Sequence, residues 1–263
     1  MKNVIINADD FGQTISCTKA IYDAFEIGLI TDTTMVANGD ALDLACEYIN
    51  KNKRFSNHIG CHLVLTEGKP ISKSILSNNK FVDNNGYFTN YFLKKTSFFK
   101  FLSKKDKSDL FEELNAQIIF FEKKGISITH IDSHHHVHFN CKLLPIVMKI
   151  CKQHSVKKIR RTKNASKLKP LEKIYSFYVK RKIEKNNFLI TNYFGNIKEY
   201  CEVSDGVSEL MVHPDYNEKN ELIDRINKKN VSEVKYNNGV DLKYVISLIV
   251  KEDCNMISYR LLK

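Results

Sequence analysis

The stretch VIINADDFG, residues 4–12, decides the fold more than any other part of the chain. Its apolar β-branched residues predict a buried strand, and polar residues follow the strand directly. After a short loop, apolar residues recur at helical spacing up to Gly28, which would end the helix; they are Cys17, Ala20, Ile21, Ala24 and Phe25. The chain is therefore expected to open with a strand followed by a helix.

The same order repeats along the chain. Further strands are expected at 59–65, 126–131, 156–159 and 210–212, and helices at 44–49, 109–124, 143–151, 171–183 and 242–250. We expect Asp109 and Glu112 to cap the helix at 109–124. Strands that alternate with helices predict βαβ units and a mainly parallel sheet. This pattern fits either a closed barrel or an open sheet. Residues 72–108 are polar and aperiodic, so we expect an excursion from the main fold. Four prolines and no Gly/Ser linker favour a single domain, residues 1–263.

The overall composition is that of a globular protein, with 43% hydrophobic and 27% charged residues. The best apolar run, residues 245–250, is far shorter than the roughly 18 residues that cross a bilayer. The N-terminus lacks the basic and apolar regions of a signal peptide, so we expect a cytoplasmic location. Seven scattered cysteines fit reduced thiols better than a disulfide framework.

The net charge of +11 comes almost entirely from one segment. Between residues 157 and 185 there are twelve Lys or Arg against two Glu. This segment is either a solvated helix face or a contact for an anionic glycan or a membrane surface. A basic nucleic-acid-binding module is the less favoured alternative, because no zinc-finger, RNP or helix-turn-helix pattern is present. Apart from these partners, the chain could also assemble as a homodimer.

Residues of catalytic type follow four of the expected strands. They are Asp9 and Asp10 after 4–6, His62 after 59–61, the histidine-rich HIDSHHHVH at 130–138, and His213 after 210–212. In parallel α/β folds the carboxyl ends of the strands share one face, so these residues should meet in one pocket. A helix N-cap for the acids and hydrogen-bonded structural roles for single histidines are the alternatives.

The histidine-rich segment is the densest of these signals. In an extended chain alternate residues share a face, and here these would be His130, Asp132, His134, His136 and His138. Five histidines beside an acid favour metal binding or catalysis. The chain has no G-x-S-x-G, Walker, G-x-G-x-x-G or H-E-x-x-H motif, which speaks against serine hydrolases, nucleotide-cofactor enzymes and zincins.

Together these stretches resemble the YdjC-like (ChbG/HpnK) family of carbohydrate deacetylases. The matching motifs are NADDFG (7–12), GLITDTTMVANG (28–39), GCHLVLTEGKP (60–70), THIDSHHHVH (129–138), ELMVHP (209–214) and ISYR (257–260). They occur in the family's order over nearly the whole chain. The resemblance implies a distorted TIM-type (β/α) barrel with one divalent metal ion.

The resemblance also assigns roles to individual residues. It implies that Asp10, His62 and His134 hold the metal, that Asp9 is the general base, and that His213 is the general acid. The family is usually described with magnesium, whereas an Asp-His-His set also suits zinc or iron(II).

Three further residues of the histidine-rich segment, Asp132, His136 and His138, are expected to support the ligands or contact the sugar. The activity implied is hydrolysis of the acetamide of an N-acetylated sugar, in an N-acetylglucosamine-containing oligosaccharide or glycoconjugate. A metal-dependent glycosidic or phosphoester hydrolase at the same site is the alternative.

Overall fold

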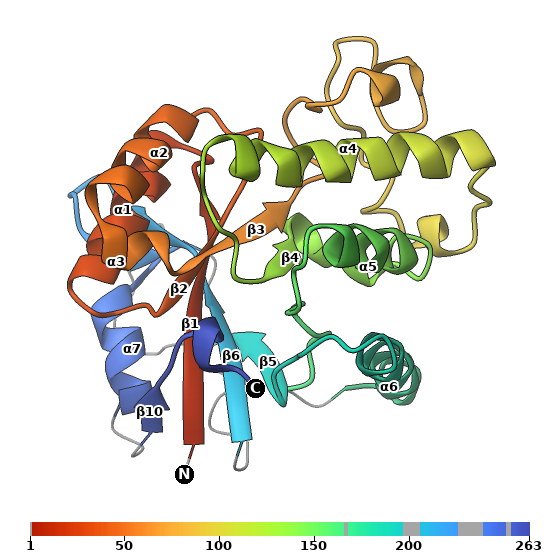
Figure 1. The fold of residues 1–263 in the computed structure, drawn as a ribbon. Helices are drawn as coiled ribbons and strands as arrows, with labels where there is room; N and C mark the ends of the chain where they lie inside the picture. Colours follow the sequence, from red (N-terminus) through yellow and green to blue (C-terminus); the bar gives the residue numbers. More distant parts are fainter. Residues whose placement is uncertain (1, 166–167, 197–205, 226–238, 251–253) are drawn as a thin grey trace.

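The structure is a computed structural model that describes residues 2–165, 168–196, 206–225, 239–250 and 254–263. Its centre is a parallel sheet that curls into a half-barrel (Figure 1). The strand order is β4-β3-β2-β1-β6-β5, with β10 paired to β1. The bounds are β1 Lys2–Phe11, β2 Asp32–Met35, β3 Ile59–Leu63, β4 Ile131–Ser133, β5 Tyr193–Asn196, β6 Gly206–Val212 and β10 Cys254–Met256.

Helices cover the outside of this sheet. They are α1 Ile15–Glu26, α2 Leu42–Lys51, α3 Lys53–Ser56, α4 Lys104–Lys123, α5 Leu144–Gln153, α6 Pro170–Glu184 and α7 Leu242–Val250. Short 3₁₀ segments are η1 Ser74–Ser77, η2 Lys95–Phe98, η3 His134–Phe139 and η5 Tyr259–Leu261. A small antiparallel sheet joins β7 Pro214–Tyr216, β8 Leu222–Asp224 and β9 Val240–Asp241. No helix in the described ranges has the length and apolarity to cross a membrane.

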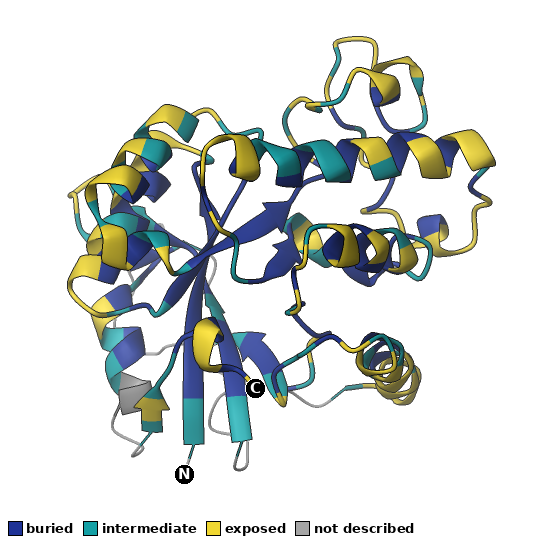
Figure 2. Ribbon diagram, viewed as in Figure 1, coloured by how far each residue is buried: buried dark blue, intermediate teal, exposed yellow. Residues whose placement is uncertain are grey.

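The core lies between the sheet and the helices, and the strands are almost entirely buried (Figure 2). Strand β1 is buried from Val4 to Phe11, which fits a central strand covered on both faces. The 72–108 segment is largely irregular, as expected, but it is not wholly exposed. It buries Phe81 and Phe92, whose rings are stacked with centroids 5.6 Å apart.

Some boundaries differ from the sequence-based expectation. Helix α4 begins five residues early, because Ser103 and Asp106 form its capping box; Asp109 and Glu112 do not cap it. The strand expected at 126–131 is β4, which begins only at Ile131. The strand expected at 156–159 is reduced to isolated parallel bridges, Ile131 to Ile159 and Lys158 to Leu189. Strands β2 and β5 were not predicted.

Candidate active site

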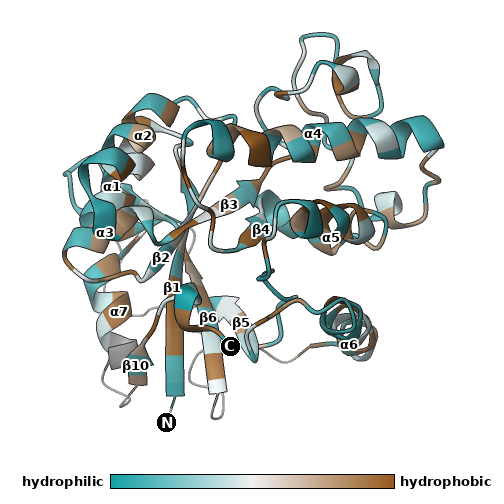
Figure 3. Ribbon diagram, in the orientation of Figure 1, coloured by the Kyte–Doolittle hydropathy of each residue, from teal (hydrophilic) through white to brown (hydrophobic). Residues whose placement is uncertain are grey.

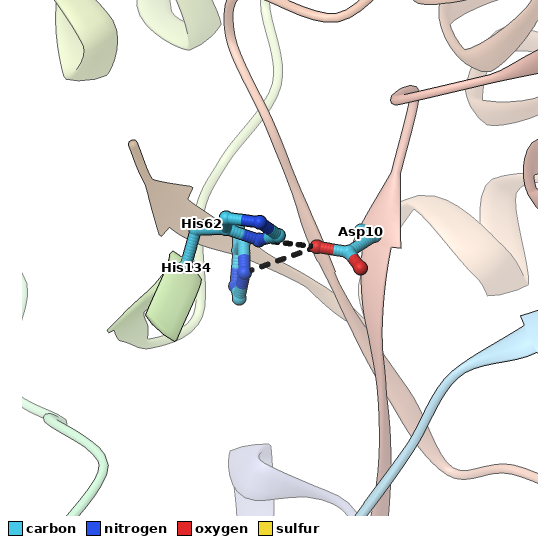
Figure 4. A group of neighbouring side chains, drawn as sticks. All are labelled: Asp10, His62 and His134. Carbon is cyan, nitrogen blue, oxygen red and sulfur yellow. Dashed lines mark hydrogen bonds and ion pairs between the residues drawn. The ribbon is translucent and has the colours of Figure 1, made fainter. Parts of the chain in front are cut away.

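Three side chains from different elements meet at the carboxyl ends of the strands: Asp10 from β1, His62 from β3 and His134 at the start of η3 (Figure 4). Asp10 Oδ1 lies 3.3 Å from His62 Nε2 and 2.9 Å from His134 Nδ1. One ligand atom from each lies within 4.8 Å of the others. The structure thus brings the three expected metal ligands together.

A bulge in β1 explains how two adjacent acids can serve one site. The pairing of β1 with β2 shifts register between Ala8 and Phe11, and Asp10 has a φ of +74°. This left-handed conformation is rare for non-glycine residues and is often found at functional sites. Because the bulge breaks the alternation of the strand, Asp9 and Asp10 both line the same pocket.

The ring of His62 is fixed from behind by Asp132. His62 Nδ1 lies 2.7 Å from Asp132 Oδ1, which leaves Nε2 directed at Asp10. Burial disfavours the imidazolium, but the charges and hydrogen bonds of Asp132 and Asp10 outweigh it and raise the pKa of His62 to about 10. An acid bonded to one ring nitrogen sets the tautomer and orientation of a histidine, and Asp132 has this position relative to His62.

Asp9 is held by a fully buried arginine. Arg160 donates from Nη1 and Nη2 to both carboxylate oxygens of Asp9, at 2.7 and 2.6 Å, and Asn7 donates to one of them at 2.8 Å. The same guanidinium reaches Asp132 at 2.6 Å and Glu209 at 2.7 Å. Although burial opposes the charged carboxylate, the ion pair with Arg160 lowers the pKa of Asp9 below its usual value.

The histidine-rich segment does not stay extended, so its alternate residues do not share one face. His135 and His136 have φ of +53° and +56°, and the chain turns into η3 directly after β4. His138 is therefore folded back and buried, with Nδ1 2.5 Å from Ser133 Oγ and Nε2 3.3 Å from the carbonyl of Arg160. His136 lines the pocket, and His130 is stacked on Tyr259 in the core.

His213 follows β6 and lines the same pocket, a cavity of about 640 Å³. Its backbone is fixed on both sides, since its N–H donates to Asp224 at 3.3 Å and its carbonyl accepts from Arg225 at 2.9 Å. Both predicted catalytic residues and all three predicted ligands therefore line one cavity.

Two residues that the sequence did not single out also contact this cluster. Arg225 donates to Asp10 Oδ2 at 3.0 Å, and Glu67 Oε2 lies 2.9 Å from His134 Nε2. Glu67 lies two residues after the strand predicted at 59–65, so its position could have been noticed, whereas Arg225 follows no predicted strand. Arg160 directly follows the strand predicted at 156–159, so the expectation that site residues lie at strand ends could have identified it.

The donor chemistry fits a divalent metal ion. Among the described residues, Asp9, His62 and Asp132 form a second group whose ligand atoms lie within 4.8 Å of one another. In that group both acids are already paired with Arg160, whose positive charge opposes a nearby metal ion. The set Asp10, His62 and His134 faces the open cavity, and its single acid is paired with the partly exposed Arg225 rather than with a buried arginine, so this set fits the ion better.

The basic 157–185 segment is not one solvated face. Arg160 and Arg161 are buried, and Lys158 donates to the carbonyls of Tyr259 and Arg260. Part of the charge excess is therefore paired with interior acids or hydrogen-bonded to backbone carbonyls, and only the remainder is available to a partner.

A family described as "YdjC-like protein" matches residues 3–256. The chain belongs to this family. A relative from Clostridium beijerinckii named "Carbohydrate deacetylase" is 31% identical over 218 residues, which is 81% of each chain. Another relative of that name, from Oceanobacillus iheyensis, is 37% identical over 153 residues, and the match spans 58% of this chain and 62% of the relative.

A solved structure has the same fold as this member of the YdjC-like family. It is a crystal structure from Enterococcus faecalis V583 named for cellobiose-phosphate cleavage, with a TM-score of 0.70 and 24% identity. The match covers 100% of this chain and 99% of that one. The similarity supports the α/β half-barrel over the whole chain.

Proposed function

We propose that this chain is a metal-dependent hydrolase that removes the acetyl group from N-acetylated sugars. The observation that carries the proposal is the convergence of Asp10, His62 and His134 on a cavity that Asp9 and His213 also line. Two relatives named carbohydrate deacetylase support the reaction type. The substrate class proposed is an N-acetylglucosamine-containing oligosaccharide or glycoconjugate.

Asp10, His62 and His134 would hold one divalent metal ion. When bound, the ion would act as a Lewis acid toward the acetyl carbonyl and lower the pKa of water. Two imidazoles and one carboxylate suit zinc or iron(II), while magnesium prefers oxygen ligands. Three protein ligands would leave coordination positions of the ion open for water or substrate, as in catalytic rather than structural metal sites.

The chain's own residues would carry the proton transfers. Asp9, kept ionised by Arg160, would accept a proton from the attacking water, and His213 would donate a proton to the departing sugar amine. Arg160 and Asn7 fix the direction of the Asp9 carboxylate, so that little reorganisation is needed during the reaction.

We also propose that the half-barrel is a distorted TIM-type (β/α) barrel. The bridges Ile131 to Ile159 and Lys158 to Leu189 lie between β4 and the stretch leading into β5, where such a barrel would close. A single domain, a cytoplasmic location and a homodimer stay predictions.

The test is acetate release from a panel of N-acetylglucosamine compounds, using metal-stripped protein resupplied with Mg²⁺, Zn²⁺ or Fe²⁺. We expect no acetate without metal and restored release with at least one ion. His62→Ala should lose both bound metal and activity, so retained metal would remove His62 from the ligand set. Release of phosphate or of a cleaved sugar without acetate would favour the phosphoester or glycosidic alternative.

A further inference from the structure

The ring of His134 lies between two carboxylates. Glu67 Oε2 is 2.9 Å from His134 Nε2, and Asp10 Oδ1 is 2.9 Å from His134 Nδ1. A histidine that binds a metal ion is a neutral imidazole with one proton, and a carboxylate only accepts hydrogen bonds. Glu67 therefore favours the tautomer with the proton on Nε2, which leaves the lone pair of Nδ1 on the side of Asp10.

The same arrangement occurs at the other histidine of the site. Asp132 lies 2.7 Å from His62 Nδ1, and His62 Nε2 is directed at Asp10. The two rings turn opposite nitrogens toward Asp10, yet each has an acid on its remaining nitrogen. An acid in this position orients the ring, and its loss typically weakens metal binding roughly 10–100-fold.

Glu67 differs from Asp132 in its exposure to water. The side chain of Glu67 is 57% exposed, whereas that of Asp132 is fully buried. Glu67 lines the active-site pocket and also a neighbouring cavity of about 630 Å³. An exposed ion pair contributes little to folding stability, so an effect of Glu67 should be visible in metal binding rather than in unfolding.

Glu67 reaches His134 from the 64–72 loop, whose two ends are held by α4. Figure 3 shows hydrophilic residues along much of α4, and two of them, Glu113 and Gln117, are fully buried. Gln117 donates to the carbonyl of Val64 at 2.7 Å and accepts from its N–H at 2.9 Å. The carboxylate of Glu113 accepts from the N–H of Ile71 at 3.0 Å. These buried polar groups are thus spent on fixing the loop.

The middle of the 64–72 loop is fixed as well. The amide of Asn38 donates to the carbonyls of Glu67 and Lys69, at 3.0 and 3.1 Å. Gly68, between them, has a φ of +73°, and a Cβ there would lie 2.9 Å from Asn38 Nδ2. The exposed carboxylate of Glu67 therefore extends from a backbone that is held on three sides.

We propose that Glu67 is a positioning residue that holds the His134 ring with Nδ1 directed at the metal ion. This inference rests on the metal site of the proposed function and adds a residue that acts on the ion through His134. It also assigns a purpose to the 64–72 loop, which directly follows β3, the strand that carries His62.

The experiment is a calorimetric titration of metal-free protein with Zn²⁺ alone, without any sugar. Glu67→Ala should weaken Zn²⁺ binding roughly 10–100-fold. Glu67→Gln should lie between this variant and the wild type, because its amide oxygen can still accept from Nε2. The melting temperature of the metal-free Glu67→Ala protein should change by less than about 3 °C, because the ion pair is exposed.

Asp40→Ala is the matched control for the loss of negative charge. Asp40 is exposed and lines the same two cavities as Glu67, while the ring nitrogens of His134 are already taken by Asp10 and Glu67. Asp40→Ala should weaken Zn²⁺ binding much less than Glu67→Ala does. An equal loss would overturn the inference, because the effect would then come from charge and not from the orientation of His134.

Asn38→Ala tests the loop in a double-mutant cycle. It removes the hydrogen bonds to the carbonyls of Glu67 and Lys69. It should weaken Zn²⁺ binding in the wild-type background and have little effect in the Glu67→Ala background, because Asn38 acts through Glu67. Equal losses in both backgrounds would overturn the inference.

Two further results would overturn the role of Glu67. One is a Zn²⁺ affinity of Glu67→Ala equal to that of the wild type. The other is a loss as large as that of Asp10→Ala, which would make Glu67 a ligand. Acetate release, measured separately, distinguishes the two proposals. If the expected Zn²⁺ affinities are found but no acetate is released, the deacetylase proposal fails and the role of Glu67 stands; acetate release with unchanged affinity in Glu67→Ala means the reverse.

Discussion

Asp9 and Asp10 are neighbours in the chain but have different partners. Asp9 forms a bidentate ion pair with Arg160, while Asp10 contacts His62 and His134. The left-handed backbone at Asp10 keeps both carboxylates at one pocket, whereas a regular strand would place them on opposite faces. Each acid can therefore be tested by itself.

Asp9→Asn should retain bound metal and lose turnover. The amide keeps the shape of the side chain but cannot accept a proton, and a positioned proton transfer is worth roughly 10²–10⁴ in rate. Metal content and acetate release, measured on the same sample, check this expectation. Loss of metal together with activity would instead make Asp9 a ligand.

Arg160→Met should strongly destabilise the protein. Arg160 neutralises Asp9, Asp132 and Glu209 in the interior, and removing one partner of a buried ion pair costs about 3–5 kcal/mol. Urea unfolding at neutral pH gives the free energy of unfolding. A loss below about 1 kcal/mol would show that these acids do not depend on Arg160. Lys173→Met, at an exposed position of the same basic segment, is the control.

At the scale of elements, β3 positions His62 through close packing at Gly60. A Cβ at Gly60 would lie 2.6 Å from His130 Cε1 and 2.7 Å from Thr34 Cγ2. Neither contact is sterically tolerable, so the neighbours or the strand must move.

Gly60→Ala should therefore cost about 1–3 kcal/mol of stability and weaken metal binding by shifting β3. Thermal unfolding and metal titration check both effects. Gly86→Ala is the control, because its new Cβ meets nothing within 4 Å and only its φ of +81° is unfavourable. It should lower stability without changing metal affinity. Equal metal affinity in both variants would contradict the packing argument.

Sequence periodicity predicted the helices better than the strands. Helix α5 buries one apolar side, and that repeat is visible in the sequence. The apolar repeat of α6 is also visible, but only part of it is buried: Val179 and Ile183 are buried, whereas Leu171 is 80% exposed. Strand β2 contains only four residues, DTTM, of which Asp32, Thr33 and Thr34 are polar yet buried, so no apolar run marks it. Local propensity could not reveal a strand whose polar groups bond to distant partners.

For the whole molecule, Asp32 ties the C-terminal segment to the sheet. Its carboxyl oxygens accept from Ser258 Oγ at 2.8 Å and from the backbone N–H of Tyr259 at 3.1 Å. Burial raises the pKa of Asp32 to about 8, despite these hydrogen bonds. The folded state therefore binds a proton at this residue more tightly than the unfolded state does.

This raised pKa predicts how stability depends on pH. Between about pH 4 and pH 8 the folded state holds more protons at Asp32, so stability should fall as pH rises, by up to about 1.4 kcal/mol per pH unit. Asp32→Asn should remove this contribution, so the stability of the variant relative to the wild type should increase as pH rises to about pH 8. The measurement is the free energy of unfolding in urea over this pH range. A difference between variant and wild type that does not change with pH would contradict the prediction.

Most residues of the candidate site could be recognised in the sequence, although Arg160, Arg225 and Glu67 were not singled out. Strand-end polar residues such as Asp10, His62 and His213 could be identified because parallel strands present their carboxyl ends on one face. The tertiary structure alone decided how they are held. The bulge at Asp10, the turn at His135 and the burial of Arg160 depend on contacts between segments far apart in the chain, and these contacts override local patterns.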